Sequence, residues 1–423
     1  MKIMVVGGGG REHAIIKNLR KSPKAEVIYA LPGNGGIASD AECADIRATD
    51  IEAVVDFARA KAIDYAVVAP DDPLAMGCVD ALNEAGIRAF GPDKKAAEIE
   101  ASKIFSKNLM KKYGIPTAGY EVFGESGAAL EYLKTSPVPV VIKADGLALG
   151  KGVVIAETRE EAAEAVRSMM EEKKFGDSGN RIVIEEFLTG PEVSVLSFTD
   201  GKTLVPMVSS MDHKRALDGD RGLNTGGMGA VAPNPYYTEE IAERCMKEIF
   251  LPTIEAMKAE GRVFKGCLYF GLMLTEEGPK VIEYNCRFGD PETQVVLPLL
   301  ESDLLEVMEA VTDGRLSETE VKFADKCACC VVLASGGYPG SYEKGCEITM
   351  GQMDGNVEVF VAGASLQDEM LKTSGGRVMG VTAVADTLAE AIDSAYRNVK
   401  KIEFEKVHYR TDIGKRALEA ERK

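Results

Sequence analysis

The chain has 423 residues, of which 45% are hydrophobic and 28% are charged, and this composition excludes a largely disordered protein. With 50 Lys and Arg against 67 Asp and Glu, the formal charge is −17, which argues against nucleic acid or an anionic membrane surface as the main partner. At about 150 residues per domain, the length predicts two to four domains with substantial cores.

The first 100 residues predict a small domain with a parallel sheet. Apolar runs at 2–7, 27–30 and 66–70 indicate strands, and the segments 12–20 and 51–62 indicate helices between them. Strands that alternate with helices are typical of a parallel α/β sheet. The Gly7–Gly10 run after the first strand fails the G-x-G-x-x-G dinucleotide pattern, because the last position is Glu12 or His13, and no acid follows the second strand. Two interpretations stay open: a loop that presents N–H groups to one phosphate, or a tight strand-to-helix turn.

From Ala101 to about Asp313 the pattern changes to α+β with antiparallel strands. V-V-I-K-A and G-V-V-I-A flank D-G-L-A-L-G-K-G (145–152), which has three residues between its first two glycines and Gly152 in the place of a Walker Ser or Thr. We interpret this loop as a flap over a triphosphate, with Lys143 and Lys151 supplying charge; the alternative is a hairpin with a solvated lysine. The D-G pair at 200–201 predicts a further hairpin, and helices are expected at 159–172 and 238–259.

The segment I-E-Y-N-C-R-F-G-D-P-E-T-Q (282–294) carries the clearest candidate for a metal site. Glu283, Asn285 and Arg287 alternate along a predicted strand and therefore share one face, while Ile282 and Tyr284 point to the other. A carboxylate beside an amide oxygen suits Mg²⁺, and an arginine close by suits a phosphoryl group or a carboxylate. The alternative is a half-solvated strand face.

A fourth candidate site consists of M-D-H-K-R (211–215) and N-T-G-G-M-G (224–229). The glycine-rich run is too long for a simple turn, and its backbone amides suit a bound anion. His213 is either a general base or, more commonly for a lone histidine, a structural hydrogen-bonding group. The tail predicts strands at 328–334, 357–362 and 378–385 and a helix at 388–400. Cys327 and Cys330 form a C-x-x-C, but the apolar run that follows predicts a buried strand and no zinc site.

The N-terminal segment has too short an apolar run for a signal peptide, and no stretch has the about 20 apolar residues of a membrane helix. The nine cysteines are scattered and odd in number, which favours reduced thiols and a cytoplasmic protein.

Six motifs together resemble the phosphoribosylamine–glycine ligases, a purine-biosynthesis family of the ATP-grasp superfamily. They are G-G-G-R-E-H-A (8–14), P-G-N-x-G (32–36), K-A-D-G-L-A-x-G-K-G-V (143–153), D-H-K-R (212–215), N-T-G-G-M-G-A (224–230) and the segment 282–294. The resemblance spans essentially the whole chain. It implies that ATP, glycine and 5-phosphoribosylamine give glycinamide ribonucleotide, ADP and phosphate through a glycyl phosphate.

The resemblance also implies roles for the matching positions. Lys103 and Lys143 would contact the ATP phosphates, the flap would close over them, the segment at 185–188 would meet adenine through its backbone, and Glu192 would accept a ribose hydroxyl. The full ATP-binding set is Lys103, Lys143, Gly146, Gly150, Lys151, Gly152, Glu185, Glu186, Phe187, Leu188 and Glu192. Glu283 and Asn285 would hold Mg²⁺ or Mn²⁺. Arg287 and Lys143 would be the catalytic residues, with Arg287 steadying the acyl phosphate.

The resemblance also implies a pocket for glycine and phosphoribosylamine. Its implied residues are Gly8, Gly9, Gly10, Arg11, Glu12, Asp212, His213, Lys214, Arg215, Asn224, Thr225, Gly226, Gly227, Arg287, Asp290, Pro291, Glu292 and Thr293. No general base is required, because a free amine is already nucleophilic. The chain departs from the family pattern at Asp71–Asp72 and at Met211, Arg221 and Leu223. The departure at Asp71–Asp72 puts the substrate contact of that loop in question.

The expected architecture is α/β and α+β with three domains. These are a Rossmann-like pre-ATP-grasp domain (1–101), an ATP-grasp domain (102–325) with a mobile lid at about 120–190, and a small C-terminal α+β domain (326–423). We expect a monomer that binds neither nucleic acid nor membrane. One alternative is an ATP-grasp ligase with another acceptor amine. A second is a nicotinamide-dependent oxidoreductase, which the failed dinucleotide pattern disfavours. A third is a catalytically silent nucleotide-binding sensor, which the presence of Lys143, Glu283, Asn285 and Arg287 disfavours.

Overall fold

The computed structural model describes residues 1–147 and 152–422, and its first unit is a five-stranded sheet of order β3-β2-β1-β4-β5 whose pairs are all parallel. The predicted parallel α/β sheet is thus confirmed. β1 sits at the centre and is almost wholly buried, as its continuous apolar run requires. The strands are β1 (Lys2–Gly7), β2 (Val27–Pro32), β3 (Glu42–Cys43), β4 (Tyr65–Val68) and β5 (Arg88–Phe90). The helices around them are α1 (Gly10–Leu19), α2 (Ile51–Lys61), α3 (Asp71–Met76), α4 (Cys78–Glu84) and α5 (Lys94–Ala101).

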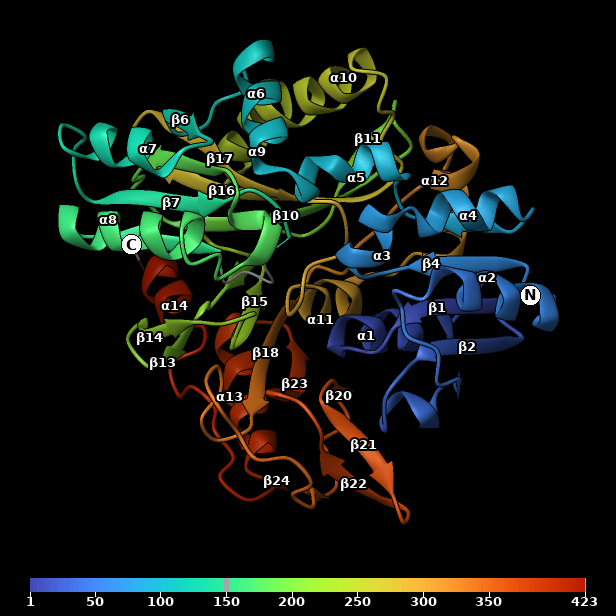
Figure 1. Cartoon of the computed structure of the whole chain (residues 1–423). Helices are drawn as coiled ribbons and strands as arrows, with labels where there is room; N and C mark the ends of the chain where they lie inside the picture. The colour runs from blue at the N-terminus through green and yellow to red at the C-terminus, as the bar shows by residue number, and fades with distance from the viewer. Residues whose placement is uncertain (148–151, 423) are drawn as a thin grey trace.

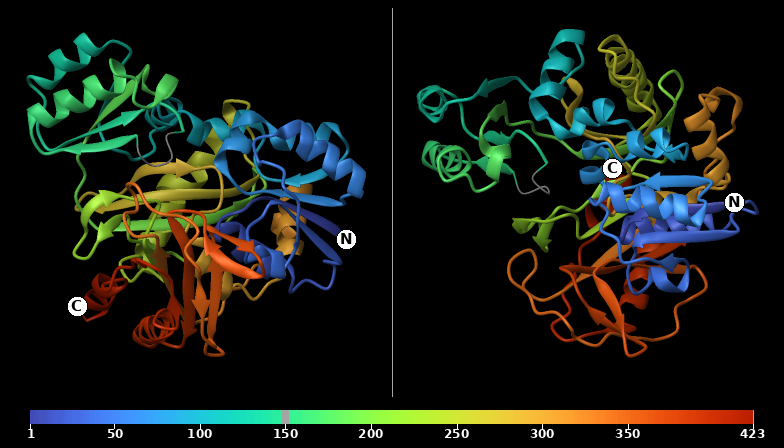
Figure 2. Two further views of the ribbon diagram at one scale, coloured as in Figure 1. Left: turned by 60° about the horizontal axis from the view of Figure 1, so that its bottom comes forward. Right: turned by 45° about the vertical axis from the view of Figure 1, so that its right-hand side comes forward.

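A second, antiparallel sheet of order β6-β9-β7-β8 forms a separate lobe, which Figure 2 shows projecting from the rest of the molecule. Its strands are β6 (Tyr120–Phe123), β7 (Val140–Ala144), β8 (Val153–Ala156) and β9 (Ile182–Glu186). Helices α7 (Ser126–Leu133) and α8 (Arg159–Met170) cover one face with a core of their own, to which β7 contributes Ile142 and β9 contributes Ile184. Alternation along a strand therefore turns Lys143 and Glu185 to the opposite face.

The third sheet has the order β11-β10-β16-β17, with strands β10 (Glu192–Thr199), β11 (Leu204–Pro206), β16 (Gly266–Thr275) and β17 (Gly278–Asn285). The predicted D-G hairpin is confirmed: Gly201 has φ +85°, and Asp200 accepts the backbone N–H groups of Lys202 and Thr203. Helices α6 (Lys103–Tyr113), α9 (Glu239–Cys245) and α10 (Leu251–Ala259) lie above this sheet in Figure 1. A π-helical turn at Met246–Phe250 joins α9 to α10, so the helix expected at 238–259 is continuous but irregular.

The C-terminal sheet has the order β12-β15-β18-β23-β20 and takes two strands from the central part of the chain. β12 (Met211–Asp212) and β15 (Gly229–Ala232) pair beside β18 (Cys327–Ala334), β20 (Val357–Val361) and β23 (Arg377–Ala385). The buried Cys329 and Cys330 on β18 confirm the buried strand predicted for the C-x-x-C. Helix α13 (Leu388–Val399) packs on β18 and β23, and α14 (Lys415–Glu421) ends the chain.

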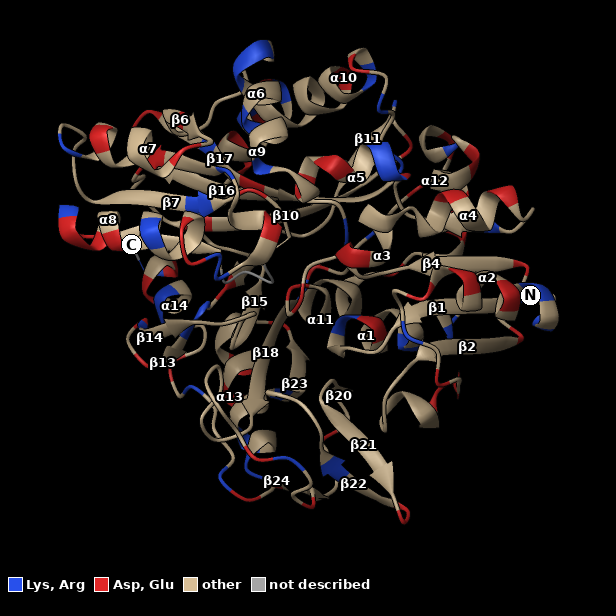
Figure 3. Ribbon diagram, viewed as in Figure 1, with Lys and Arg blue, Asp and Glu red and all other residues tan. Residues whose placement is uncertain are grey.

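One hydrophobic core joins the first sheet, the third sheet and the C-terminal sheet. It contains Ile3 and Val5 of β1, Leu304 of α12 (Leu304–Asp313), Tyr269 of β16 and Cys330 of β18. Both signs of charge are interspersed over the outer helices, as α8 shows (Figure 3). Among the described residues, no helix is long and apolar enough to cross a membrane.

Candidate active site

The predicted metal ligands lie at the end of β17, on a face left open by a glycine. Glu283 pairs with Gly271 and Asn285 pairs with Tyr269 on β16. A Cβ on Gly271 would lie 3.0 Å from Cγ of Glu283, so glycine at this position makes room for the carboxylate. Tyr284 points the other way and its hydroxyl lies 3.0 Å from Oγ1 of Thr253. The predicted alternation is therefore correct for Glu283, Tyr284 and Asn285.

Arg287 does not share that strand face, because β17 ends at Asn285. Its guanidinium instead pairs with Glu100 of α5, with Nη2 at 3.1 Å from Oε1. Glu100 also accepts the Cys286 N–H at 2.7 Å, which ties the end of β17 to α5. Burial raises the pKa of Glu100, although the charge of Arg287 opposes the increase. The interpretation of one continuous strand through Arg287 is thus wrong, and a buried ion pair orients this arginine instead.

Lys143 on β7 is a buried lysine with two partners. Its Nζ donates to the carbonyl of Ile282 on β17 at 3.0 Å and lies 3.1 Å from Oε2 of Glu185. Lys107 of α6 approaches the same carboxylate oxygen at 2.9 Å and donates to Oγ1 of Thr117 at 2.7 Å. Burial lowers the pKa of Lys107 to about 8. Two ammonium groups thus share one carboxylate where the lobe of β6–β9, which we call the lid from here on, meets β17.

Glu185 holds this arrangement through its side chain. The residue lies inside the lid ladder, between Tyr120 of β6 and Val141 of β7, and not at a free strand end. Its Oε1 has no hydrogen-bond partner among the described residues, although the side chain is buried. The adjacent Glu186 N–H donates to the carbonyl of Gly119 at 2.8 Å, so this backbone group is also bonded within the lobe. The structure thus gives Glu185 a side-chain role that the sequence did not indicate.

Lys103 anchors the start of the flap. Its Nζ donates to the carbonyl of Gly146 at 2.8 Å, and burial lowers its pKa while the charge of Glu283 opposes that change. Asp145 accepts from Oγ of Ser102 at 3.0 Å and pairs with Arg181 at 2.8 Å. Gly150 and Lys151 of the predicted flap lie outside the described residues, and Gly152 accepts the Ala144 N–H at 2.8 Å.

Lys214 connects the predicted ribose acceptor with the predicted metal ligand. Its Nζ lies 3.2 Å from Oε2 of Glu192 and 3.6 Å from Oε1 of Glu283. The Glu192 charge raises the pKa of Lys214 well above its usual value. Burial works against ionisation of Glu283, but Lys214, Lys143 and Lys103 hold its pKa below the usual value. The carboxylate is therefore anionic at neutral pH, as a ligand of a hard cation must be.

The N-terminal glycine loop is closed by Glu12. The Gly9 N–H donates to Oε2 of Glu12 at 2.6 Å, and Nε of Arg11 lies 2.7 Å from Oε1. Nη1 of Arg11 donates to the carbonyl of Phe288 at 3.1 Å, which holds this loop against the segment that follows β17. The Gly9 amide is thus already bonded, and the loop is in this respect a capped helix start.

Three other predicted substrate segments converge beside that loop. A Cβ on Gly227 would lie 2.3 Å from Cδ of Pro291 and 2.7 Å from Oδ1 of Asp212, and a Cβ on Gly9 would lie 3.6 Å from Oδ2 of Asp290. Glu292 accepts from the hydroxyl of Tyr269 at 3.1 Å. The segments at 8–12, 212–215, 224–227 and 290–293 are therefore brought together.

Arg377 of the C-terminal sheet holds these segments and was not predicted. Its Nη1 donates to the carbonyls of Gly226 at 2.7 Å and Asp290 at 3.0 Å, and pairs with the Asp290 carboxylate at 3.2 Å. Its sequence distance of about 90 to 150 residues from its partners leaves no local signal. Lys107 could have been found, since it follows Lys103 by one helical turn.

His213 has no ring nitrogen left for a substrate. Its Nδ1 lies 3.2 Å from the carbonyl of Gly229, and the Gly414 N–H donates to Nε2 at 3.1 Å. Burial lowers its pKa to about 4, with the charges of Arg410 and Arg416 acting in the same direction. This geometry supports the structural hydrogen-bonding alternative, because the neutral imidazole joins two backbone segments, and it corrects the implied substrate contact and the alternative of a general base. Thr225, another predicted pocket residue, donates its hydroxyl to the Lys214 carbonyl at 2.8 Å.

The lid sheet facing the β10–β16–β17 sheet, with buried lysines between them, defines the ATP-grasp class of enzymes. Sequence models of the phosphoribosylglycinamide synthetase family match residues 1–100 as the N domain, 101–293 as the ATP-grasp (A) domain and 328–416 as the C domain. The chain belongs to the phosphoribosylamine–glycine ligase family.

Individual relatives agree with this assignment. A phosphoribosylamine–glycine ligase of Caldanaerobacter subterraneus is 48% identical and covers 98% of this chain and 99% of its own, and one of Pasteurella multocida is 47% identical over 100% and 99%. The crystal structure of the Thermotoga maritima phosphoribosylamine–glycine ligase superposes with a TM-score of 0.86 at 35% identity, covering 98% of this chain and 100% of the other. The biotin carboxylase domain of the Hydrogenobacter thermophilus 2-oxoglutarate carboxylase, solved with MgADP, shows the same fold at 18% identity, with a TM-score of 0.75 over 96% and 91%.

Proposed function

We propose that the chain joins glycine to 5-phosphoribosylamine with ATP, giving glycinamide ribonucleotide, ADP and phosphate in purine biosynthesis. The observation that carries this proposal is the position of three charged groups where the lid contacts β17. Lys143 donates to the carbonyl of Ile282, and Lys214 pairs with Glu283, the next residue of that strand. The chain also matches its relatives along nearly their full length. This cationic surround suits a triphosphate, and the segments that converge at Pro291 suit the two small substrates.

We assign the ATP-side roles as follows. Lys103 and Lys143 contact the phosphates, Glu192 accepts from ribose, and the backbone after Glu186 meets the adenine. A hollow of about 1080 Å³ borders that segment and is lined in part by Tyr120, Val140 and Phe187, an apolar surface that suits a purine base.

The Glu283 carboxylate and the Asn285 amide oxygen fit a magnesium or manganese ion shared with the nucleotide. Within the described residues, no cluster of three or more His, Cys, Asp or Glu side chains is arranged to hold a metal ion by itself. A site with few protein ligands is typical of Mg²⁺ that is also bound by substrate phosphates. When bound there, the ion neutralises charge on the transferring phosphoryl group.

The proposed chemistry has two steps. A glycine carboxylate oxygen attacks the γ-phosphorus of ATP, and ADP leaves; glycyl phosphate is the product. The amine nitrogen of phosphoribosylamine then attacks the carbonyl carbon, phosphate leaves with the carboxylate oxygen, and the nitrogen loses a proton to solvent. Arg287, held by Glu100, and Lys143 neutralise charge on the phosphoryl group in the first step. The enzyme supplies alignment and exclusion of water, because glycyl phosphate hydrolyses readily.

We further propose three domains at 1–101, 102–325 and 326–423 with a mobile lid at about 120–190, since the lid has its own hydrophobic core. The nine free thiols suit the reducing cytoplasm. We also propose a monomer.

The test is ADP release with all three substrates and Mg²⁺, for the wild type and for Lys143→Ala and Glu283→Ala. We expect both variants to stay folded and to lose activity by a factor of about 1,000. A matched control is Lys280→Ala on the same β17, whose ammonium pairs with Glu277 at 2.7 Å away from these groups. Wild-type-like turnover in either site variant contradicts the assignments, and turnover with another amine but not phosphoribosylamine contradicts the substrate.

A further inference from the structure

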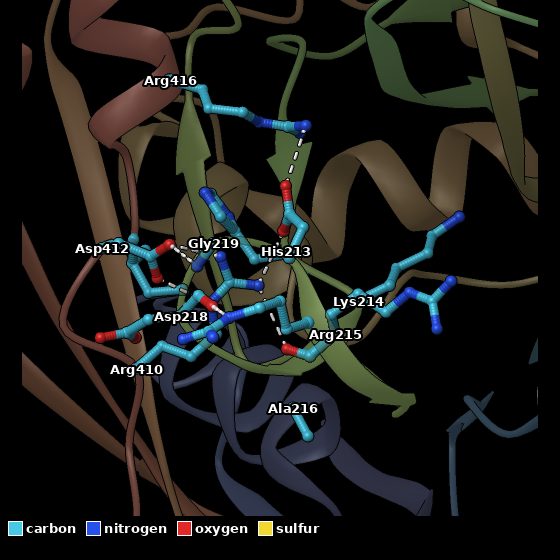
Figure 4. A network of polar contacts seen from close by, with 12 residues as sticks. His213, Lys214, Arg215, Ala216, Asp218, Gly219, Arg410, Asp412 and Arg416 are labelled. Carbon is cyan, nitrogen blue, oxygen red and sulfur yellow. Dashed lines mark hydrogen bonds and ion pairs between the residues drawn. The ribbon is translucent and has the colours of Figure 1, made fainter.

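The C-terminal segment 408–416 makes a set of polar contacts with a distant β-hairpin, and the site roles assigned above do not account for these contacts. The hairpin consists of β13 (Arg215–Leu217) and β14 (Arg221–Asn224), which pair antiparallel, and it is far from this segment in sequence. Figure 4 shows the residues of the two segments side by side in one polar network.

Arg410 is the centre of this network, and its side chain is almost completely buried. Nε and Nη2 donate to the two carboxylate oxygens of Asp412 at 2.8 and 2.9 Å. Nη1 donates to the Arg215 carbonyl at 3.1 Å and to Oδ1 of Asp220 at 2.9 Å. One planar guanidinium therefore bonds the first residue of β13, the turn of the hairpin and its own segment at once.

Backbone groups repeat the same connection on both sides of Arg410. The Gly219 N–H donates to Asp412 at 2.7 Å, and the Thr411 N–H donates to Asp218 at 2.8 Å. His408 Nε2 lies 2.8 Å from the carbonyl of Ala216, and Gly414 donates to His213, as described above. β13 and the turn of the hairpin are thus bonded to residues 408–416 at several points.

Both ends of the hairpin run directly into the proposed active site. Before β13, Lys214 reaches Glu192 and Glu283. After β14, Thr225 returns to the Lys214 carbonyl, and Gly226 meets Arg377. A shift of the hairpin would therefore move both of these segments relative to Pro291.

We propose that Arg410 is a positioning residue of the ligase: it fixes the β13–β14 hairpin so that residues 212–215 and 224–227 form the pocket for glycine and phosphoribosylamine. Arg410 touches no substrate and acts through the backbone of Arg215 and the hairpin turn. The inference rests on the proposed function. It also explains why a buried arginine is surrounded by Asp218, Asp220 and Asp412, a cluster that the reaction itself does not use.

The test is the Arg410→Gln variant, with Arg416→Gln as the matched control. Arg416 is half exposed and its ion pair is with the same Asp220 at 3.0 Å. We expect Arg410→Gln to raise the KM for glycine, for phosphoribosylamine or for both about tenfold, with the KM for ATP within twofold and a folded protein. Arg416→Gln is expected to leave all three values within twofold. If Arg410→Gln does not fold, Arg410→Lys, which keeps the charge but not the planar fork, is measured in its place.

A merely structural role predicts a lower melting temperature with all three KM values unchanged, and that result overturns the proposal, as does an increase in the ATP KM alone.

Amide hydrogen exchange over residues 213–225 tests the hairpin without any substrate: we expect faster exchange in Arg410→Gln than in the wild type, and equal rates overturn the proposal. Wild-type enzyme that makes no glycinamide ribonucleotide contradicts the proposed function, while the exchange measurement still tests the hairpin.

Discussion

Lys143 illustrates how a single residue carries both structure and chemistry. A lysine within an apolar strand is costly to bury without a partner, and this cost indicates a function from the sequence alone. The structure supplies the partner, because Glu185 on β9 binds both Lys143 and Lys107. Removal of one charge from such a buried group leaves the others uncompensated. The carboxylate therefore holds two ammonium groups in place before any phosphate is bound.

His213 gives a prediction about pH at the residue scale. Its pKa is about 4 in the folded chain, against about 6.5 when unfolded, so the unfolded state binds more protons between these values. The contribution of the neutral imidazole to stability is complete above pH 6.5 and is lost as pH falls toward 4. We expect the wild type to lose about 2 kcal/mol more than His213→Gln in unfolding free energy from pH 7 to pH 5, measured by urea titration. Parallel pH dependence in the two proteins would show that this histidine is not the group responsible.

Residue types along the chain predicted correctly that Glu283 and Asn285 share one face of β17, but they did not indicate the positioning residues. Glu283 and Asn285 could be found because alternation is a local property of a strand. Arg377 and Arg410 could not, because each acts on segments about 90 to 195 residues away and folding alone brings them there. The substrate contact that the resemblance implies for His213 was wrong for the same reason, since the Gly414 N–H donates to its Nε2 from the end of the chain, whereas the structural alternative for this histidine agrees with the geometry.

At the scale of elements, Gly227 tests whether the convergence at Pro291 matters. The residue has φ +111°, and a Cβ there would lie 2.3 Å from Pro291. Gly86 has φ +80° with no atom within 4 Å of a Cβ, so Gly86→Ala has the backbone strain of about 1 kcal/mol without the clash. We expect Gly227→Ala to lower turnover about 100-fold and Gly86→Ala to leave it within twofold. Steady-state kinetics on both purified variants decide the matter, and equal effects would refute a role for close packing here.

Elements were predicted more reliably than their partners. The strand runs and the D-G hairpin are visible in sequence because they depend on alternation and a turn. The pairing of β15 with β18 is not, because it joins residues about 100 positions apart. The end of β17 at Asn285 also differs from the expected strand, and there the Glu100 carboxylate takes the Cys286 N–H from outside the sheet.

On the scale of the whole molecule, the lid and the body differ in how they are held. The lid has a hydrophobic core of its own, whereas the core of the first unit continues into α12, β16 and β18. The polar contacts from Lys143 and Thr117 to β17 connect the two parts. A lobe with its own core can move as a unit around such contacts, which suits an enzyme that must admit ATP and then exclude water.

The central claim is that the glycine carboxylate is activated by phosphoryl transfer, and glycine labelled with ¹⁸O in its carboxylate tests it directly. The measurement is mass analysis of the phosphate released during turnover with ATP, Mg²⁺ and phosphoribosylamine. Attack by the carboxylate oxygen predicts that one labelled oxygen per turnover appears in phosphate. Phosphate without label, formed together with labelled product, would contradict the account.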